Sequence, residues 1–404
     1  MKEINELVKE DQKMKMGTRI FLTTLIAATP FAATAQEDVT VGFAIALSGF
    51  VAPYDDGPYK AAKLAIEEIN AKGGLLGRKI VEVSADTASD PAQGATAATD
   101  VLSKNAELVM VTCDFDFGAP AALVAQSQDK IAFSSCAADA KFGVQGIGPN
   151  AYTMATATNH QGAILAEFAW KTLGKRNVYI LNDLQVEYNK SLCSNFEKRW
   201  RELAGGEGVA GYDEYNAGND TVIAAQVSRM KDAEAKSDVI MFCGAINGGS
   251  YIRQIRAAGI DLPMITGESM DGTYWLEAVP DLSTFYNLTY GSIHGDDPEP
   301  RVNEFVEAFT KAYGEAPVTG HALTGYSVIE AWALAVERAG TFETEAVRAQ
   351  LDSFSEEDLL VGKTSFTSDL HISNARPMTI IEIEGGKASA TGVFDAEKTP
   401  EITF

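Results

Sequence analysis

The sequence predicts an α/β fold in which parallel sheets are covered by helices, arranged in two domains. Two observations support this prediction. Strand-like and helix-like segments alternate with little interruption from residue 39 onward, which is the pattern of a parallel sheet with helices on both faces. The chain also has 404 residues, more than a single hydrophobic core usually serves.

The first series of elements begins at residues 39–45, where apolar residues alternate as in a strand. An amphipathic helix is predicted over 58–70, and a pair of glycines ends it. Asp90 and Pro91 have the residue types of an N-cap and a first helical position. Further strands are predicted at 80–84, 107–112 and 131–134. Together these segments describe one doubly wound unit.

A second series starts near residue 161 and repeats this plan. Its predicted helices cover 161–173, 190–203, 221–233 and 251–258, and its predicted strands cover 178–181, 238–242 and 263–265. The chain then continues with helices predicted at 302–313 and 322–339 and with paired strands at 378–384 and 391–394. The repetition indicates two units of the same class.

The N-terminal segment predicts an exported protein. Residues 20–32 form a short apolar run that follows three basic residues and leads into small residues at 33–35. This is the pattern of a signal peptide, so we expect residues 1–35 to be removed by cleavage between Ala35 and Gln36. A membrane anchor is the alternative, but a spanning helix needs about 20 apolar residues.

The charge of the chain limits its partners. The formal net charge is −23, and the acidic residues are spread along the sequence. Nucleic acid is excluded as a partner because phosphate binding needs clustered Lys and Arg. Insertion into anionic membranes is disfavoured for the same reason. The composition favours a soluble monomer kept apart from its copies by self-repulsion.

Five segments, in order and at matching spacing, resemble a known family. They are SGFVAPY at 48–54, INAKGGLLGR at 69–78, DTASDPAQ at 86–93, YIRQIRAAGI at 251–260 and TGESMDG at 266–272. On these segments the chain resembles the type I periplasmic binding proteins of the branched-chain amino acid ABC uptake group, whose Leu/Ile/Val-binding members are typical. The resemblance covers nearly the whole chain after the leader.

The resemblance implies two doubly wound, Rossmann-like lobes that are joined by three crossing strands and bind ligand in the cleft between them. The N-terminal lobe would comprise 38–156 and 293–366, and the C-terminal lobe 157–292 and 367–404. The implied function is capture of a small amino-acid-like solute, of the branched-chain type, by hinge closure in the periplasm of a Gram-negative cell. An inner-membrane ABC permease is the implied partner, and no cofactor or metal is implied.

The physics of doubly wound sheets indicates where a ligand would bind. Loops at the carboxyl ends of the strands point into the crevice, beside helix N-termini that favour negative charge. Binding residues should therefore follow strands directly. The segments that do so are 113–117, 135–138, Tyr188, 245–247 with Ala245, and Glu268.

Matching to the family assigns roles to single residues. Tyr54 falls on the cleft tyrosine, Tyr188 on the aromatic that closes over the ligand, and Glu268 on the carboxylate that holds the ligand ammonium. A buried carboxylate is costly unless it is paired, so a cationic ligand group is its natural partner. The alternatives are core tyrosines and a surface carboxylate.

Phe115, Cys136 and Ala138 fall where family members grip an amino-acid carboxylate, largely through main-chain N–H groups. Asp114 and Asp116 lie in the same loop and would repel such a carboxylate if they pointed inward. They could instead face solvent or cap the helix that follows.

His321 falls on another position that lines the cleft, although a lone His is more often structural. The ligand class therefore stays open at this point. It is either a zwitterionic aliphatic amino acid or an amine, amide or aromatic compound without an α-carboxylate.

Four cysteines in an exported protein allow three pairings. Cys113 and Cys136 end neighbouring predicted strands, so this pair is preferred. Cys193 and Cys243 could pair or stay buried as thiols.

Catalytic functions find little support. The sequence has no G-x-S-x-G, P-loop, H-E-x-x-H or C-x-x-C motif, and its four histidines are too dispersed to predict a zinc site. No catalytic residues are therefore assigned. A periplasmic hydrolase is the least favoured alternative, and a sensory receptor that shares the same fold and leader is another.

Overall fold

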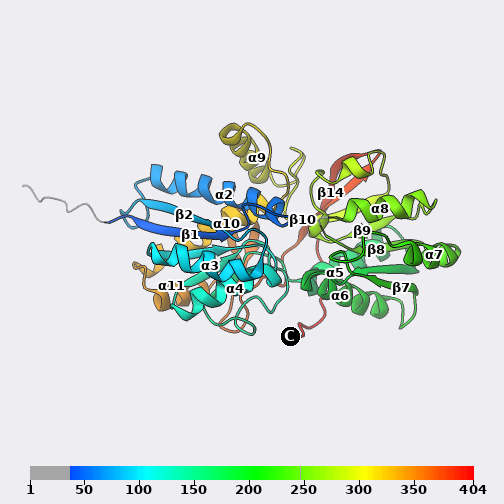
Figure 1. The fold of residues 1–404 in the computed structure, drawn as a ribbon, viewed down its shortest axis with the longest axis horizontal. Helices are drawn as coiled ribbons and strands as arrows, with labels where there is room; N and C mark the ends of the chain where they lie inside the picture. The colour runs from blue at the N-terminus through cyan, green and yellow to red at the C-terminus, as the bar shows by residue number, and fades with distance from the viewer. Residues whose placement is uncertain (1–36, 246) are drawn as a thin grey trace, which may run out of the picture. The chain divides into compact units, whose positions relative to one another are not determined.

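Two β-sheets form the framework of the protein, and helices cover them (Figure 1). The computed structural model describes residues 37–404 apart from residue 246. The predicted leader, with its cleavage point between Ala35 and Gln36, lies outside the described residues. Residues Glu37–Phe404 form one unit.

The first sheet has five parallel strands in the order β2-β1-β3-β4-β5. Its strands are β1 (Val39–Ile45), β2 (Ile80–Asp86), β3 (Ala106–Val111), β4 (Ile131–Ser134) and β5 (Ala151–Thr153). The helices between them are α2 (Ala52–Ala71), α3 (Pro91–Ser103) and α4 (Phe115–Ser127). Strand β4 is buried along its whole length, as expected for a parallel strand covered on both faces.

The second sheet has seven strands in the order β14-β13-β10-β9-β8-β6-β7. They are β6 (Val178–Asp183), β7 (Val209–Tyr215), β8 (Val239–Cys243), β9 (Met264–Thr266), β10 (Phe285–Thr289), β13 (Met378–Glu384) and β14 (Lys387–Phe394). Strands β6 to β10 run parallel, and the β13–β14 hairpin joins the edge at β10 in antiparallel fashion. The helices are α5 (Thr158–Glu167), which continues into a π-helical turn, α6 (Glu187–Leu203), α7 (Ala224–Ala233) and α8 (Gly248–Ala257).

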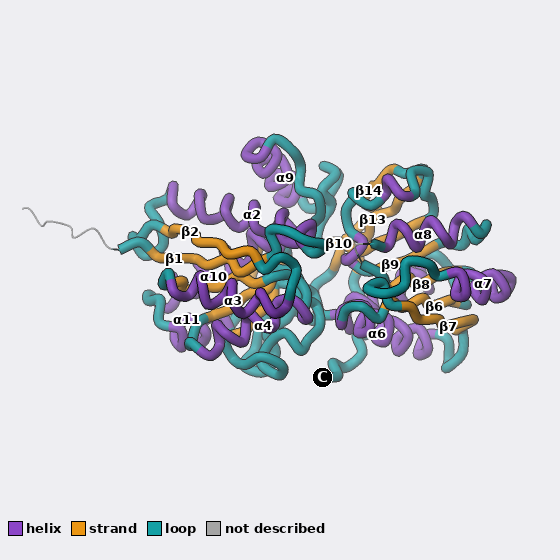
Figure 2. The backbone as a smooth tube through the Cα atoms, in the orientation of Figure 1, coloured by secondary structure: helices purple, strands orange, loops and turns teal. Residues whose placement is uncertain are grey.

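A later part of the chain returns to the first sheet. It contains α9 (Pro300–Tyr313), α10 (His321–Ala339), α11 (Thr344–Leu351) and the short hairpin of β11 (Glu357–Leu359) and β12 (Gly362–Thr364). Helix α10 packs against α2, and α11 packs against α10 (Figure 2). Each sheet with its helices therefore draws on separate stretches of the chain.

Three connections run between the two sheets: 154–157, 290–299 and 365–377. Two of them are joined directly, because Thr156 forms a bridge with Ser373 and the N–H of Ala157 donates to the Ser373 carbonyl over 2.8 Å. The buried guanidinium of Arg376 also donates to the Met154 carbonyl over 2.7 Å. These hydrogen bonds hold the crossing strands side by side.

The predicted fold class is confirmed, and the elements predicted from periodicity are present with small shifts at their ends. The largest shift is in α2, which begins at Ala52, so that Pro58 lies inside the helix and does not start it. Strands β5, β7 and β10 and helix α11 were missed. Strand β7 is an edge strand whose first four residues are only partly buried or exposed, so its sequence lacks a continuous apolar run. Within the described residues, no helix combines the length and apolarity needed to cross a bilayer.

Candidate functional site

A cavity lies where loops from the carboxyl ends of strands in both sheets meet. The first sheet contributes the start of α2 and the segments after β3 and β4, and the second sheet contributes the segments after β6, β7, β8 and β9. The empty space between the side chains is about 640 Å³, its open side included. This is the location that the topology of doubly wound sheets predicts for a ligand.

Seven of the nine predicted binding residues line this cavity. They are Tyr54, Asp114, Cys136, Tyr188, Ala245, Glu268 and His321. The other two, Phe115 and Ala138, do not line the cavity. Phe115 is the first residue of α4 and packs against an apolar cluster of the first sheet, and Ala138 is buried in the main hydrophobic core. The use of any of these residues in binding stays a prediction.

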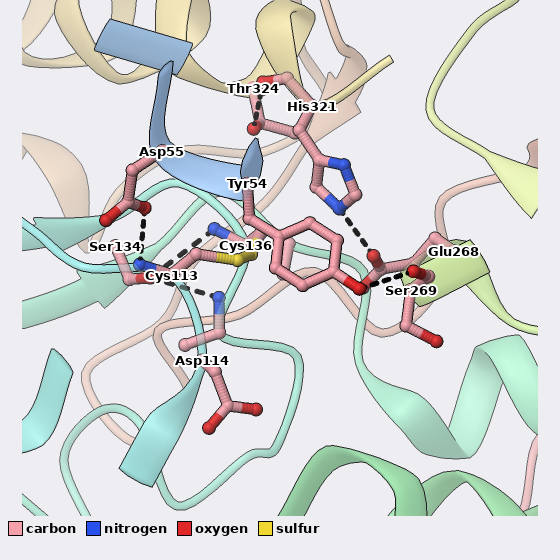
Figure 3. The surroundings of a disulfide bond; sticks show 12 residues. Tyr54, Asp55, Cys113, Asp114, Ser134, Cys136, Glu268, Ser269, His321 and Thr324 are labelled. Atoms are coloured by element: carbon pink, nitrogen blue, oxygen red, sulfur yellow. Dashed lines mark hydrogen bonds and ion pairs between the residues drawn. A yellow bond between two sulfur atoms is a disulfide. The ribbon is translucent and has the colours of Figure 1, made fainter. Parts of the chain in front are cut away.

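Glu268 has a protein partner in this structure. It begins a short 3₁₀ turn directly after β9 and is only 2% exposed. One carboxylate oxygen, Oε2, lies 2.5 Å from Nε2 of His321, the first residue of α10 (Figure 3). The other oxygen, Oε1, has only long contacts, 3.4 Å from the Tyr290 hydroxyl and 3.5 Å from the Gln161 amide. Glu268 is thus paired on one oxygen and weakly bonded on the other.

His321 is fully buried, and its second ring nitrogen, Nδ1, lies 3.1 Å from the Thr319 hydroxyl. Burial lowers the pKa of His321, but the charge of Glu268 and the hydrogen bond to it outweigh burial and raise the pKa above its usual value. Two more buried carboxylates, Asp271 and Asp55, act in the same direction. The imidazole is therefore held in its charged form as the partner of Glu268.

The two predicted tyrosines contact the segment around Glu268. Tyr54 donates its hydroxyl hydrogen to the Ser269 carbonyl over 2.6 Å, which links α2 to the segment after β9. Tyr188 donates to the side-chain oxygen of Gln161 over 2.8 Å and accepts the N–H of Glu268 over 3.0 Å. Both hydroxyls are therefore satisfied by the protein itself.

Asp114 combines two of the orientations considered for it, because it lines the cavity and also caps a helix. Its Oδ1 accepts the N–H of Asp116 over 2.8 Å at the N-terminus of α4. Its backbone φ is +76° with ψ at 150°, a conformation that is uncommon for residues other than Gly. Burial and the neighbouring charge of Asp116 raise the pKa of Asp114 well above its usual value.

The loops expected to grip a carboxylate use several of their N–H groups internally. The buried side chain of Asp55 accepts the N–H of Cys113 over 2.8 Å and that of Ala46 over 2.7 Å. The Ser134 hydroxyl accepts the N–H of Ala137 over 3.0 Å and, more weakly, that of Cys136 over 3.4 Å. Burial raises the pKa of Asp55 to about 7, although the hydrogen bonds from the N–H groups of Cys113 and Ala46 act to lower it.

The structure contains two disulfides. Cys113 is bonded to Cys136, and this bridge joins the ends of β3 and β4 in the cavity wall, where it packs against Tyr54 (Figure 3). Cys193 of α6 is bonded to Cys243 at the end of β8. The second bridge does not line the cavity.

Comparison with known proteins identifies the family. Residues 38–388 match the model of the family described as periplasmic binding protein. The chain belongs to the periplasmic binding protein family. The family predicted from the five sequence segments is therefore confirmed.

The relatives of this binding protein extend over its whole length. A Leu/Ile/Val-binding protein of Rhizobium johnstonii is 27% identical over 379 residues, which cover 93% of this chain and all of the relative. The isoleucine complex of a branched-chain amino acid transporter substrate-binding protein from Streptococcus pneumoniae has a TM-score of 0.77 at 24% identity, and the match covers 89% of this chain and 99% of that one.

A second solved structure of the same fold holds a different kind of ligand. It is a solute-binding protein of an ABC transporter from R. palustris in complex with benzoate. Its TM-score is 0.74 at 18% identity, and the match covers 90% of this chain and 98% of that one. At these identities the solved structures show that the fold is shared.

The binding protein also has cavity residues that the sequence analysis did not single out. They include Phe50, Asp183, Gln185, Tyr251 and Ser269. Asp183 is the last residue of β6, so the strand-end rule applied above contained a signal for it. Tyr251 lies one turn inside α8, and only the helix geometry turns it toward the cavity.

Proposed function

We propose that this protein is the substrate-binding component of an ABC uptake transporter. After removal of residues 1–35 it acts in the periplasm, captures a small organic solute and delivers it to an inner-membrane permease. The observation that supports this proposal best is the cavity, whose walls come from the strand ends of both sheets. Family membership and the full-length relatives support the same role.

The proposal includes two lobes that close on a hinge. We assign 38–156 and 293–366 to one lobe and 157–292 and 367–404 to the other, in agreement with the strands that each sheet contains. Contacts cross this boundary at the cavity, among them those from Tyr54 to the Ser269 carbonyl and from His321 to Glu268. Solute that bridges the same loops would stabilise the closed form.

The solute is of amino-acid size, and two classes are candidates. The names of the relatives favour a branched-chain amino acid, with Glu268 as the partner of its ammonium group. An amine, amide or aromatic compound without an α-carboxylate is the second candidate, and the position of Asp114 in the cavity wall favours it. The benzoate complex indicates that this fold accepts solutes of more than one class.

A thermal-shift screen of the purified protein against amino acids, amides, amines and aromatic acids tests this function. A solute at 100 times its dissociation constant should stabilise the folded state by about 2.7 kcal/mol. X-ray scattering should then show a smaller radius of gyration in the presence of the solute that binds. Failure of every class to bind would contradict the proposed function, and an unchanged scattering profile at saturation would contradict hinge closure.

A further inference from the structure

Among its described residues the cavity wall carries three acidic side chains and no basic side chain other than His321, and its side-chain amide donors are those of Gln185 and Asn247. Three acids, Asp114, Asp183 and Glu268, line it, and Oδ1 of Asp183 already accepts the N–H groups of Gln185 over 3.0 Å and of Ala217 over 2.9 Å. Its described lining residues include no Lys or Arg. Its one cationic side chain, His321, has both ring nitrogens in use, on Glu268 and on Thr319. A ligand anion would therefore find no free cationic side chain.

Acids of the protein use part of the region where an amino-acid carboxylate would bind. The N-terminus of α4, which would attract an anion, is capped by the carboxylate of Asp114. The N-terminus of α6 is also occupied, because Oδ2 of Asp116 accepts the N–H of Glu187 over 2.7 Å. Between these helices the wall presents the Cys113–Cys136 disulfide, which has no N–H or O–H group to donate.

The rest of the wall is well suited to an organic cation. Five aromatic side chains line the cavity: Phe50, Tyr54, Phe117, Tyr188 and Tyr251. The faces of such rings attract ammonium groups when the site is shielded from water. They also cover apolar groups, so a ligand with a hydrocarbon body and a charged end matches both properties of the wall.

We propose that the solute is an organic amine with an apolar or aromatic body and no carboxylate, bound with its ammonium group among Asp114, Asp183 and Glu268. This inference rests on the proposed function and names its substrate class. Glu268 remains a partner of the ammonium group through Oε1, the oxygen whose protein contacts are long.

The energetics of the cavity favour the same class of ligand. Burial raises the pKa of Asp183, and burial together with Asp116 raises the pKa of Asp114, so both carboxylates are costly to ionise in the absence of a cation. An ammonium group would offset this cost, whereas a ligand carboxylate would add a further negative charge. Binding of an amine should therefore release protons from these carboxyl groups.

The decisive experiment is calorimetry with ligands that share one hydrocarbon body. The probes are isopentylamine, leucine, isocaproate and isocaproamide, followed by phenethylamine, phenylalanine and phenylpropionate. We expect the amine of at least one series to bind at least about tenfold more tightly than the amino acid of that series. Titration of that amine in buffers of different ionisation enthalpy should also show proton release.

The variant Asp114→Asn tests the role of the charge. Asn has nearly the same shape as Asp and keeps the helix cap, so the fold is preserved while the charge is removed. It should weaken the amine at least about tenfold and leave binding of the neutral amide unchanged. Asp90→Asn is the matched control, because Asp90 caps α3 through the N–H of Ala92 over the same 2.8 Å but does not line the cavity.

The possible outcomes separate this inference from the proposed function. If in each series a ligand other than the amine binds more tightly than the amine, whether the amino acid, the carboxylic acid or, in the first series, the amide, the inference is wrong and solute binding stands. If no probe binds, the inference fails for these amines, and the wider thermal-shift screen decides whether solute binding fails with it. Equal loss of affinity in Asp114→Asn and Asp90→Asn would also overturn the role of Asp114.

Discussion

The two walls of the cavity differ in how they satisfy their polar groups. On the wall from the first sheet, the backbone N–H of Cys113 is bonded to Asp55 and the helix terminus at α4 is bonded to Asp114, so acids of the protein occupy the donors. On the wall from the second sheet, Glu268 is an acid with one weakly bonded oxygen. His321, from a helix packed on the first sheet, connects the two walls by its ion pair with Glu268.

This difference shows how proteins of one fold can differ in the groups that their cavities offer to a ligand. The strand ends and helix termini that can bind an anion in such folds are present here, but the side chains at 55, 114 and 116 have taken their N–H groups. The proposed ammonium site draws on both walls, through Asp114 on the first and Glu268 on the second. Four measurements test this difference between the two walls.

The largest effect is expected at Glu268. The variant Glu268→Gln should weaken the best solute of the screen by about 3 to 5 kcal/mol, the cost of breaking a buried ion pair, or roughly two to three and a half decades in affinity. Calorimetry on folded protein measures this directly. Glu277→Gln, at an exposed position nearby in sequence, is the control. Binding within threefold of wild type would show that Glu268 is no ligand contact.

The two disulfides should differ in what their loss affects. They close loops of 23 and 50 residues, so removing either should cost about 3 to 4 kcal/mol of unfolding free energy. Replacing Cys113 and Cys136 by Ala should also weaken solute binding, because this bridge lines the cavity. Replacing Cys193 and Cys243 should leave affinity unchanged. Denaturant titrations and calorimetry on both double variants distinguish the cases, and equal effects on affinity would contradict the comparison.

The His321–Glu268 pair predicts a pH dependence of stability. Because the folded-state pKa of His321 is raised, the stabilisation by the pair is complete below the unfolded pKa of about 6.5 and is lost as the pH rises through the folded value. The difference in unfolding free energy between wild type and His321→Gln should therefore decrease as the pH rises through the folded-state pKa of His321. Urea titrations at a series of pH values measure it. The same trend in His294→Gln, at an exposed position, would show that the pair is not its source.

The smallest effect is expected at Asp116, whose carboxylate caps the first residue of α6 from across the cavity. The variant Asp116→Ala should destabilise the closed form by about 1 kcal/mol, the usual value of a helix cap, and weaken solute binding about fivefold. Asp90→Ala removes a cap within one lobe and should lower only stability. If both variants bind solute as wild type does, Asp116 makes no contribution to closure.

Much of the architecture follows from the sequence because local patterns specify it. Apolar alternation located β1, and the Asp90–Pro91 pair marked the start of α3, where Asp90 does accept the N–H of Ala92. Strand ends then located most of the cavity wall, since doubly wound sheets place these ends together. Strand β7 was not predicted because it is an edge strand and its sequence has no continuous apolar run.

The electrostatic partners in the cavity could not be derived in this way. The sequence determined that an acid stands at 268 and a histidine at 321, but only the packing of α10 on α2 brings the imidazole within 2.5 Å of the carboxylate. Likewise, an acid at 114 was evident, whereas its double role as helix cap and cavity wall depends on the backbone at +76°. Periodicity and motifs act over a few residues, while these pairs join residues that are far apart in the chain. The energies of these pairs depend on burial and on the distance between the two groups, and both are set by the packing of the folded chain.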